Sequence, residues 1–478
     1  MKTLNLSYWD GIALVGYLIL LFIIGYRAYR RTNTKDEDDF LLGNRSLTLP
    51  AFVATLVTTW YGGILGIGEF TYSHGISTWI IFGLPYYIFA ALFAYLIAGK
   101  IRAAGQFTIA DIFYNEHGRR VGILGSIFLL FMTTPAPYIL MVALLLQIII
   151  GWSFILSLFV GTTISTIYVF WGGFRSVVQT DKFQFIIIYS GFIIFLALLW
   201  NDLGGISYLR SNLDQFHLSW IGKNSLQYII VWFFLASWTF IDPGFHQRCA
   251  AAKTLKTAKR GILVSIFFWF IFDILTIMVG LYAAATLSGI NPILSYPLLA
   301  EKYLPPFLKG LFLTGLLAVI MSTIDSFTLL SAMTFGRDLV WRIKRDKSQK
   351  ISYLTRIGLI LTAIISICLC LVFPSVIKLW YVIGSLFIPP MLLPILTAYF
   401  PKYKLSVQFT FNIMISSFSL SFFSFLWGQF HSTVNGVQYL LGIEPFFPGF
   451  FLSIILYVGF SLTTKTRKSH KDHKVFKN

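Results

Sequence analysis

Hydroxyl side chains recur at helical spacing in one long apolar stretch, residues 307–335. Four residues of this stretch share one helix face, because they stand at positions i, i+3, i+4 and i+7. They are Val319, Ser322, Thr323 and Ser326. Hydroxyls, together with backbone carbonyls at a helix break, are oxygen ligands that suit a hard cation such as sodium. The same hydroxyls can instead bond to the carbonyl four residues back, as they do in many membrane helices.

Two carboxylates occur in apolar surroundings and extend this chemistry. Asp325 lies three residues after Ser322, and Asp181 stands where another apolar segment begins. A carboxylate inside a bilayer costs about 2.5–3.5 kcal/mol on insertion scales, so it usually faces a cavity or a partner. We expect a second cation site, or a proton-exchange site, formed by Asp181, Ser322, Asp325 and Ser326. The alternative is that Asp181 pairs with Arg175 or Lys182 and only anchors a loop.

Two apolar segments are interrupted at matching places. Segment 48–72 carries Thr-Thr-Trp-Tyr-Gly-Gly at residues 58–63, and segment 226–245 carries Ala-Ser-Trp at 236–238 and Asp-Pro-Gly at 242–244. Five segments separate the start of one from the start of the other. This spacing is typical of an inverted five-helix repeat in which the first helix of each half is broken. Ordinary Gly and Pro kinks are the alternative.

A solute pocket is expected between the two interruptions, because glycines expose the backbone there and aromatic rings can close over a solute. The predicted lining is Trp60, Gly62, Gly63, Trp238, Asp242, Asp273, Trp380 and Tyr381. Asp242 precedes Pro243, so it can equally cap half of a broken helix. Two such acids favour a solute that carries an amine, although acids also bind sugar hydroxyls. With 18% aromatic residues in the chain, most rings should face lipid or other helices.

The elements that must position these residues are long apolar helices. The 478 residues are 57% hydrophobic and only 12% charged, whereas soluble domains carry about 25% charged residues. We therefore predict an all-α polytopic membrane protein with about 13 transmembrane helices. The predicted spans are 8–26, 48–72, 77–99, 121–149, 152–171, 182–200, 226–245, 261–287, 307–335, 356–373, 376–399, 405–427 and 446–463.

The formal charge of +18 follows membrane topology and does not indicate nucleic-acid binding. Nearly all Lys and Arg residues fall in alternate loops, among them 27–35, 100–120 and 248–260, and in the tail 464–478. The positive-inside rule then places the N-terminus outside and the basic tail in the cytoplasm, at the cell membrane. The tail is expected to lie near anionic lipid head groups.

Catalytic motifs are missing from the sequence. There is no HExxH, GxSxG or Walker A pattern, no His cluster with metal spacing, and three cysteines form no framework. We therefore expect no enzyme activity, no cofactor, and sodium as the only metal.

Four segments, in order, resemble motifs of the sodium:solute symporter family. They are Phe-Leu-Leu-Gly-Asn-Arg-Ser-Leu at 40–47, Gly-Gly-Phe-Arg-Ser-Val-Val-Gln-Thr-Asp at 172–181, Pro243 with Gln247, Arg248 and Lys253 in a basic loop, and residues 315–326, which end in Met-Ser-Thr-Ile-Asp-Ser. Asn44 is inserted relative to the family pattern. Each motif alone is weak, but four in family order are specific.

The resemblance implies a fold like that of the leucine transporter. Residues 1–463 would form one transmembrane domain: an accessory helix at 8–26, repeat one at 48–200, repeat two at 226–399, and two additional helices at 405–463. It implies a sodium site made by the carbonyls of Thr58, Tyr61 and Val319 and the hydroxyls of Ser322 and Thr323. Some members of the family also place a ligand of a second sodium at the position of Asp181.

The function implied is sodium-coupled import of a small polar organic solute by alternating access. The solute would be an amino acid, sugar, carboxylate or vitamin, and the sequence does not identify which. Two alternatives remain open: a proton-coupled symporter on the same fold, and a transporter-like sensor acting through a separate partner. The expected partners are the solute, sodium and the lipid bilayer, and we expect a monomer.

Overall fold

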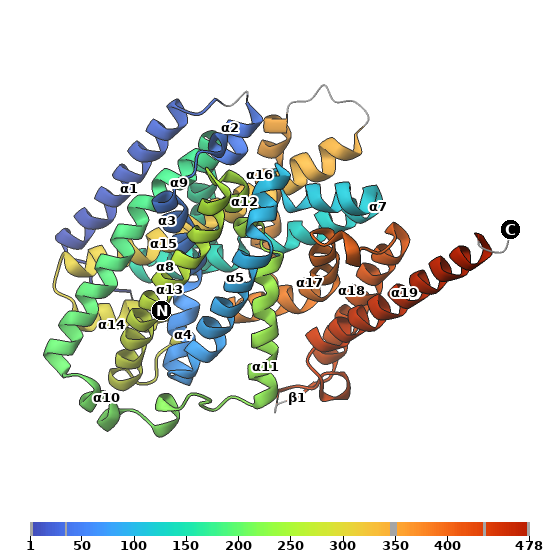
Figure 1. Cartoon of the computed structure of the whole chain (residues 1–478). Helices are drawn as coiled ribbons and strands as arrows, with labels where there is room; N and C mark the ends of the chain where they lie inside the picture. The colour runs from blue at the N-terminus through green and yellow to red at the C-terminus, as the bar shows by residue number, and fades with distance from the viewer. Residues whose placement is uncertain (1–2, 34–35, 345–350, 434–435, 476–478) are drawn as a thin grey trace.

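The computed structural model describes residues 3–33, 36–344, 351–433 and 436–475. These residues form a bundle of helices, in which the only strands are β1 (Ser432–Thr433) and β2 (Gly436–Val437), a short antiparallel pair (Figure 1). The all-α class expected from the sequence is confirmed. The helices are α1 (Tyr8–Arg30), α2 (Glu37–Leu42), η1 (Gly43–Arg45), α3 (Leu49–Trp60), η2 (Tyr61–Gly63), α4 (Ile64–His74), η3 (Trp79–Gly83), α5 (Leu84–Leu96), α6 (Ala98–Ala104), α7 (Ile109–Met132), α8 (Ala136–Ile150), α9 (Phe154–Leu203), α10 (Ile206–Asn212), η4 (Gln215–Leu218), α11 (Leu226–Leu235), η5 (Ala236–Phe240), α12 (Pro243–Ala251), α13 (Leu255–Thr286), η6 (Pro292–Leu294), α14 (Ser295–Tyr303), α15 (Leu308–Met333), η7 (Thr334–Trp341), α16 (Ile351–Val372), α17 (Val376–Ala398), η8 (Pro401–Tyr403), α18 (Val407–Phe430), η9 (Leu440–Gly442) and α19 (Phe446–Val475).

Twelve helical segments of the described residues are long and apolar enough to cross a membrane. They are Tyr8–Arg30, Leu49–His74, Trp79–Leu96, Ile109–Ile150, Gly173–Leu203, Leu226–Ala251, Leu255–Thr286, Leu308–Trp341, Ile351–Val372, Val376–Ala398, Val407–Phe430 and Phe446–Thr463. The remaining predicted span, 152–171, coincides with the first part of α9, where Phe154–Ile164 is a shorter apolar helix. The prediction of about 13 spans is therefore close.

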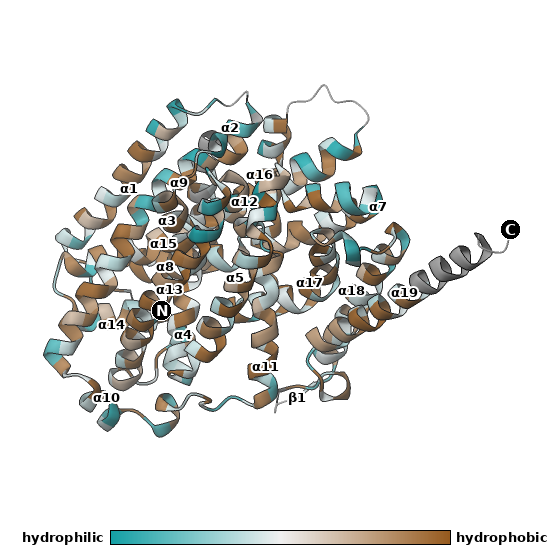
Figure 2. Ribbon diagram, in the orientation of Figure 1, coloured by the Kyte–Doolittle hydropathy of each residue, from teal (hydrophilic) through white to brown (hydrophobic). Residues whose placement is uncertain are grey.

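The bundle has an inner and an outer set of helices. In the apolar part of Leu308–Trp341, 94% of the residues are buried, and the share is 89% for Leu49–His74 but only 22% for α1. Figure 2 shows hydrophobic residues over the ribbons of the outer helices as well. Their large apolar side chains point outward, such as Ile364 and Ile455, as expected for helices surrounded by lipid. The central helices α3, α4 and α15 therefore position the site.

Both predicted interruptions are real breaks in transmembrane helices. α3 ends at Trp60, the chain tightens into the 3-10 turn η2, and α4 continues from Ile64. α11 passes into η5, and α12 begins only after Asp242. Asp242 is the N-cap residue of α12 and Pro243 occupies its first turn, where a missing N–H costs nothing. The cap role considered for Asp242 is confirmed.

The basic segment after α12 is tied to the start of α3. The backbone N–H of Leu47 donates to the carbonyl of Ala251 at 3.0 Å, and the N–H of Lys253 donates back to Leu47 at 2.9 Å. The Arg102 Nε atom donates to the carbonyl of Ala252 at 2.5 Å. These bonds tie the segment after α12 to the start of α3 and to α6, at the end of the bundle that carries the basic loops, which we call the basic face.

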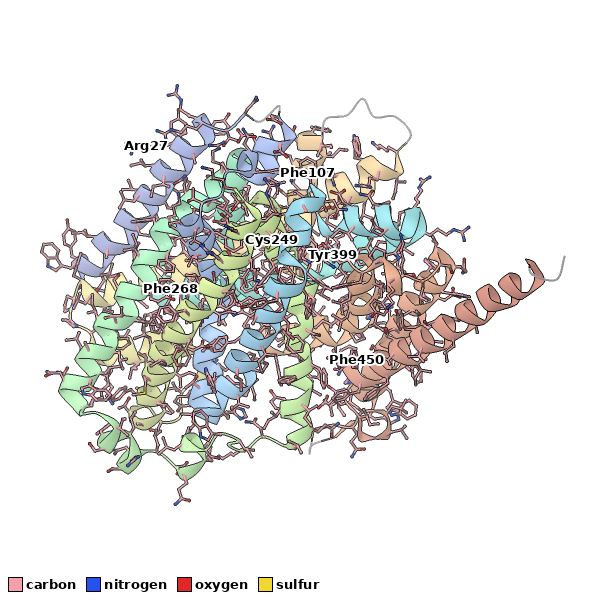
Figure 3. All side chains as sticks on the ribbon, viewed as in Figure 1. Arg27, Phe107, Cys249, Phe268, Tyr399 and Phe450 are labelled. Carbon is pink, nitrogen blue, oxygen red and sulfur yellow. The ribbon has the colours of Figure 1, made fainter. Side chains whose placement is uncertain are left out.

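Two segments differ from the loops expected from the sequence. α9 consists of two helices that meet at a kink at Gly173 (φ 57°), and Asp181 lies inside the second of them and is fully buried. Arg248, expected in a basic loop, belongs to α12 and is also fully buried. Figure 3 places the next residue, Cys249, in the interior of the bundle and Arg27 at its edge. The prediction that Arg248 lies in a loop relied on its positive charge and was wrong. The buried counter-charge, Asp181, is distant in sequence and cannot be recognised from the residues around Arg248.

Candidate functional site

A cavity of about 110 Å³ lies between the two broken helices. Both breaks contribute to its wall, together with α5, α8, α13, α15 and α17. Eight residues were predicted to line a solute pocket. Six of them line this cavity: Trp60, Gly63, Trp238, Asp242, Asp273 and Trp380. Gly62 packs instead against Thr323 of α15, and Tyr381 lines a second cavity, described below.

Aromatic rings form most of the wall, and their mutual packing fixes them. The Trp60 ring lies 4.7 Å from the ring of Tyr86 and 5.4 Å from that of Trp269, measured between centroids. On the other side, the Tyr138 ring lies 6.3 Å from that of Trp380. These edge and tilted arrangements hold the rings without filling the cavity. The wall is therefore a preformed aromatic box.

Two carboxylates face this box. The Oδ1 atom of Asp242 accepts the N–H of Phe245 at 3.0 Å as the cap of α12, and the same side chain lines the cavity. The Oδ1 atom of Asp273 accepts the Tyr61 hydroxyl at 2.6 Å, and its Oδ2 accepts the hydroxyl of Tyr87. Burial without water requires such donors. Two tyrosines thus stabilise Asp273. Asp242 both caps α12 and contacts the cavity.

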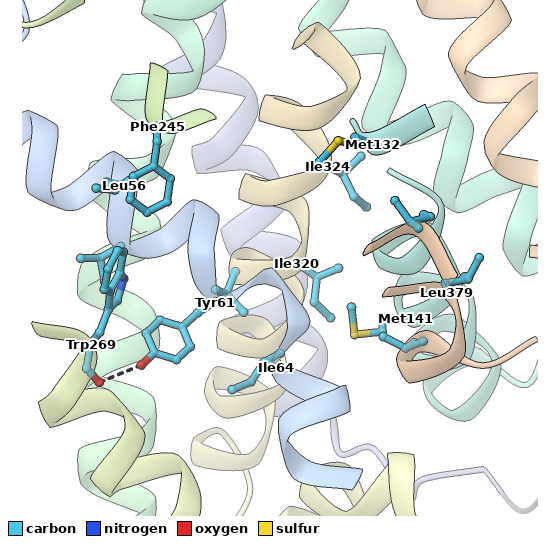
Figure 4. Close-up of a cluster of buried hydrophobic side chains, with 14 of the residues drawn as sticks. Leu56, Tyr61, Ile64, Met132, Met141, Phe245, Trp269, Ile320, Ile324 and Leu379 are labelled. Atoms are coloured by element: carbon cyan, nitrogen blue, oxygen red, sulfur yellow. Dashed lines mark hydrogen bonds between the residues drawn. The ribbon is translucent and has the colours of Figure 1, made fainter. Parts of the chain in front are cut away.

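The first break meets the hydroxyl face of α15 directly. The Thr323 hydroxyl donates to the carbonyl of Thr59 at 2.7 Å and to that of Val319 at 3.2 Å. Figure 4 shows Tyr61 and Ile64 of the break opposite Ile320 of α15, with the Tyr61 hydroxyl bonded to the carbonyl of Trp269. Thr58 bonds to the carbonyl of Ala54, four residues back. The predicted sodium ligands therefore lie on two elements in contact, and their ligand roles stay a prediction.

Asp181 is the centre of a buried polar cluster on the basic side of the cavity. Its Oδ1 accepts the Ser322 hydroxyl at 2.6 Å, and its Oδ2 accepts the hydroxyl of Thr55. The Arg248 Nη2 atom lies 4.0 Å from the carboxylate. The same atom donates to the oxygens of Ser326 at 2.7 Å, Thr59 at 2.9 Å and Thr55 at 3.2 Å.

This geometry decides how Asp181 is paired. Asp181 does not pair with Arg175, which forms a salt bridge with Asp39. Three residues of the predicted second site, Asp181, Ser322 and Ser326, lie close together. The Arg248 guanidinium lies between their oxygen atoms. Asp325 is fully buried on α15 and interacts electrostatically with Tyr17 of α1. Its assignment to a second cation site stays a prediction.

Several wall residues were not predicted. Tyr86, Tyr138, Trp232 and Phe327 line the cavity, and Tyr87 reaches Asp273. Each stands in an apolar segment where aromatic residues are common, so no spacing distinguishes it. Arg248 also lines the cavity and was named only as part of a motif.

Replacing Gly62 with alanine should abolish sodium-dependent uptake. An alanine Cβ would lie 1.9 Å from the Thr323 Oγ1 atom, so the break and α15 would have to separate. Overpacking of this kind costs about 1–3 kcal/mol. Gly459→Ala is the control, since nothing lies within 4 Å of its Cβ position. Uptake and melting temperature should both fall for Gly62→Ala alone, and an unchanged sodium dependence would contradict the close contact.

The sodium:solute symporter family model matches residues 40–406. This match covers well over half of the 478 residues. The chain belongs to the sodium:solute symporter family. It is thus a multi-pass membrane transporter, and its function class is sodium-coupled symport of a small organic solute.

Individual relatives and a solved structure agree with this assignment. The sodium/pantothenate symporter of Haemophilus influenzae is 28% identical over 379 residues, which cover 74% of this chain and 77% of the relative. High-affinity choline transporter 1 of Drosophila melanogaster is 24% identical over 414 residues, or 78% of this chain and 64% of the relative. The structure of a substrate-bound, outward-open Na⁺-coupled sialic acid symporter superposes with a TM-score of 0.77 at 18% identity, covering 97% of this chain and 98% of the other. The leucine-transporter-like fold is confirmed.

Proposed function

We propose that this symporter imports a compact organic cation, with an amine or quaternary ammonium group, into the cytoplasm together with sodium. The observation that carries the proposal is the aromatic box between the two breaks, with the carboxylate of Asp242 in its wall. The protein would lie in the cell membrane with its N-terminus outside and its basic tail inside. The division into two repeats, residues 48–200 and 226–399, belongs to the same proposal.

The charges around the cavity favour a positively charged solute. Asp242 and Asp273 face the cavity, and Asp181 lies behind the guanidinium of Arg248. Three carboxylates and one guanidinium leave a formal sum of −2. Uncompensated charge in a low-dielectric interior is costly, so cations are favoured there. One sodium ion and one monovalent cationic solute would bring the sum to zero.

The rings add selectivity for the shape of the cation. An ammonium group over the face of Trp or Tyr gains about 0.5–1 kcal/mol when exposed and about 2 or more when desolvated. Trp60, Trp238 and Trp380 offer such faces from three elements. The relative named a choline transporter in Drosophila melanogaster is consistent with this class. An apolar body would be retained by the same rings through dispersion contacts.

Sodium is proposed to bind where the first break meets α15. The carbonyls of Thr58, Tyr61 and Val319 and the hydroxyls of Ser322 and Thr323 are the ligands. Support comes from the contact between Thr323 and the carbonyl of Thr59, which holds the two elements together. Because this hydroxyl bonds to both helices, an ion bound to its oxygen would affect the position of each of them. Sodium binding would then stabilise the break in the shape that the solute requires.

A second cation at Asp181, Ser322, Asp325 and Ser326 remains part of the proposal. Its oxygens include the Ser326 hydroxyl, which now accepts from Arg248. A cation binding there would therefore have to displace the guanidinium.

Uptake into proteoliposomes tests the function directly. Labelled choline, as the first of a panel of compact cations, should accumulate under an inward sodium gradient and not under a matched potassium gradient. Its neutral tert-butyl analogue, in which carbon replaces nitrogen, should not compete. Uptake that ignores sodium and follows a pH gradient would contradict sodium coupling. Equal competition by the neutral analogue would contradict the cationic solute.

Replacing Asp242 with asparagine should weaken binding of compact cations at least tenfold. Asparagine caps helices about as well as aspartate, so α12 keeps its cap and loses only the charge. Asp202→Asn, at an exposed position of α9, is the matched control. Isothermal titration in sodium measures both affinities. Equal affinity of wild type and Asp242→Asn for the cation would exclude the charge contribution.

A further inference from the structure

A second and larger cavity, of about 400 Å³, lies beyond the first one. Its walls come from α4, α11, the start of α17 and residues on either side of η9. The Trp232 side chain lines both cavities, so it separates them. We call the first the inner cavity and the second the outer cavity. A solute that reached the inner cavity through the outer one would pass Trp232.

The outer cavity repeats the chemistry of the inner one. Two carboxylates face it from different elements, Glu69 of α4 and Glu444. Aromatic side chains form much of its remaining wall: Phe70, Tyr228, Trp232, Tyr381 and Tyr439. The Trp232 ring lies 6.2 Å from the ring of Tyr228 and 6.3 Å from that of Tyr381. Acid and aromatic rings together are the combination that attracts an organic cation.

The two acids differ in how they are held. Glu444 accepts the Tyr381 hydroxyl, and its loop is fixed where the Gln227 Nε2 atom donates to the carbonyl of Gly442 at 3.1 Å. Burial raises the pKa of the Glu444 carboxyl, and the Tyr381 hydrogen bond opposes this shift. Glu69 has a buried Oε2 atom without a hydrogen-bond partner among the described residues. An unsatisfied buried carboxylate oxygen is costly, and a cationic ligand would satisfy it.

Basic groups in the wall compensate only part of this charge. Lys378 is the lysine of the lining, and its side chain is exposed to solvent. An exposed ammonium is screened, so it offsets a half-buried carboxylate only weakly. His74 also lines the cavity, and its ring stacks on that of Phe70 at 4.1 Å between centroids. Among the lining residues, two carboxylates therefore face one exposed lysine.

We propose that the outer cavity is a second binding site for the transported cation, with Glu69 and Glu444 as its counter-charges. The proposal rests on the cationic solute argued above. A cation held there is concentrated next to Trp232 before it enters the smaller inner cavity. The inner cavity then selects the cation by its size and shape, and the outer cavity selects it by its charge and its contacts with aromatic rings.

Protection of a cysteine at Ser73 tests this site. Ser73 lines the outer cavity, and the exposed native cysteine is removed by Cys368→Ser, while Cys249 and Cys370 are buried. Purified protein carrying Ser73→Cys is labelled with a polar maleimide, so the readout requires no transport. We expect saturating choline to slow labelling at least tenfold, and its neutral tert-butyl analogue to leave the rate unchanged.

Combination with Asp242→Asn separates the two sites. If the outer cavity binds on its own, choline protection persists in Asp242→Asn and is lost when Glu69→Gln and Glu444→Gln are added. At a choline concentration below saturation, Lys378→Gln should increase protection, which a misfolded protein would not do. Protection that vanishes with Asp242→Asn, or that the neutral analogue matches, would overturn the proposal. Failure of the proposed function would instead appear as absent sodium-driven uptake, whatever happens at residue 73.

Discussion

Replacing Arg248 with methionine is expected to reduce sodium-driven uptake about 100-fold or more. The guanidinium is fully buried and is the positive charge nearest to Asp181 among the described residues. Removing one partner of a buried pair costs about 3–5 kcal/mol, because the other charge stays behind without compensation. Each 1.4 kcal/mol corresponds to a factor of ten, so a cost at the lower bound that falls on the transporting conformation gives a loss of about 100-fold. Uptake and melting temperature should fall together.

The charge origin of this loss can be separated from lost packing. Adding Asp181→Asn to Arg248→Met removes both charges, and the double variant should recover most of the melting temperature. It should not recover uptake, because Arg248 also connects α12 to α3 and α15 through three hydroxyls. Arg175→Met is the matched control. Its salt bridge with Asp39 is 31% exposed at the arginine and should contribute about 0–1 kcal/mol. Equal effects of both arginine variants would contradict a special role for Arg248.

The cluster around Arg248 also suggests how closure at the basic face depends on the site. The guanidinium contacts residues of α3 and α15, while the segment after α12 pairs with Leu47. A movement that separated α12 from α3 and α15 would therefore have to break the Arg248 contacts with Thr59 and Ser326.

The arrangement of the helices could be predicted largely from the sequence. Long apolar segments must be helical in a bilayer, because no water satisfies their backbone groups. The two breaks could be located because glycine and Asp-Pro interrupt otherwise apolar runs. The face of Ser322 and Thr323 could be derived from helical spacing alone. These signals are local, so no tertiary information was needed.

The walls of the cavities could not be predicted in the same way. Tyr86, Tyr138 and Trp232 stand in aromatic-rich segments, where the residue type does not reveal which ring faces a neighbour and which faces lipid. Tyr381 was predicted beside Trp380, yet adjacent positions on a helix point about 100° apart. One ring therefore reaches the inner cavity and the other the outer. The burial of Arg248 depends on Asp181, which is 67 positions away along the chain.

Replacing Thr323 with valine should raise the sodium concentration for half-maximal uptake about tenfold or more. Valine keeps the shape of threonine and removes only the hydroxyl, which donates to the Thr59 carbonyl at 2.7 Å. A hydrogen bond or ligand contact to a charged group contributes about 1.5–3 kcal/mol, and each 1.4 kcal/mol is a factor of ten. If the hydroxyl oxygen binds sodium, sodium affinity falls, whereas the maximal rate at saturating sodium changes little.

Thr314→Val provides the control for this shift. It lies on the same helix, and its hydroxyl donates to the carbonyl of Gly310, four residues back, at 2.7 Å. If the Thr323 hydroxyl only forms structural hydrogen bonds and does not bind sodium, neither variant should shift the sodium dependence, and the proposed sodium site would be wrong. If it binds sodium, only Thr323→Val shifts the sodium dependence. Solute affinity measured without sodium should then be equal in both variants and in wild type, because the hydroxyl acts on the solute only through the bound ion.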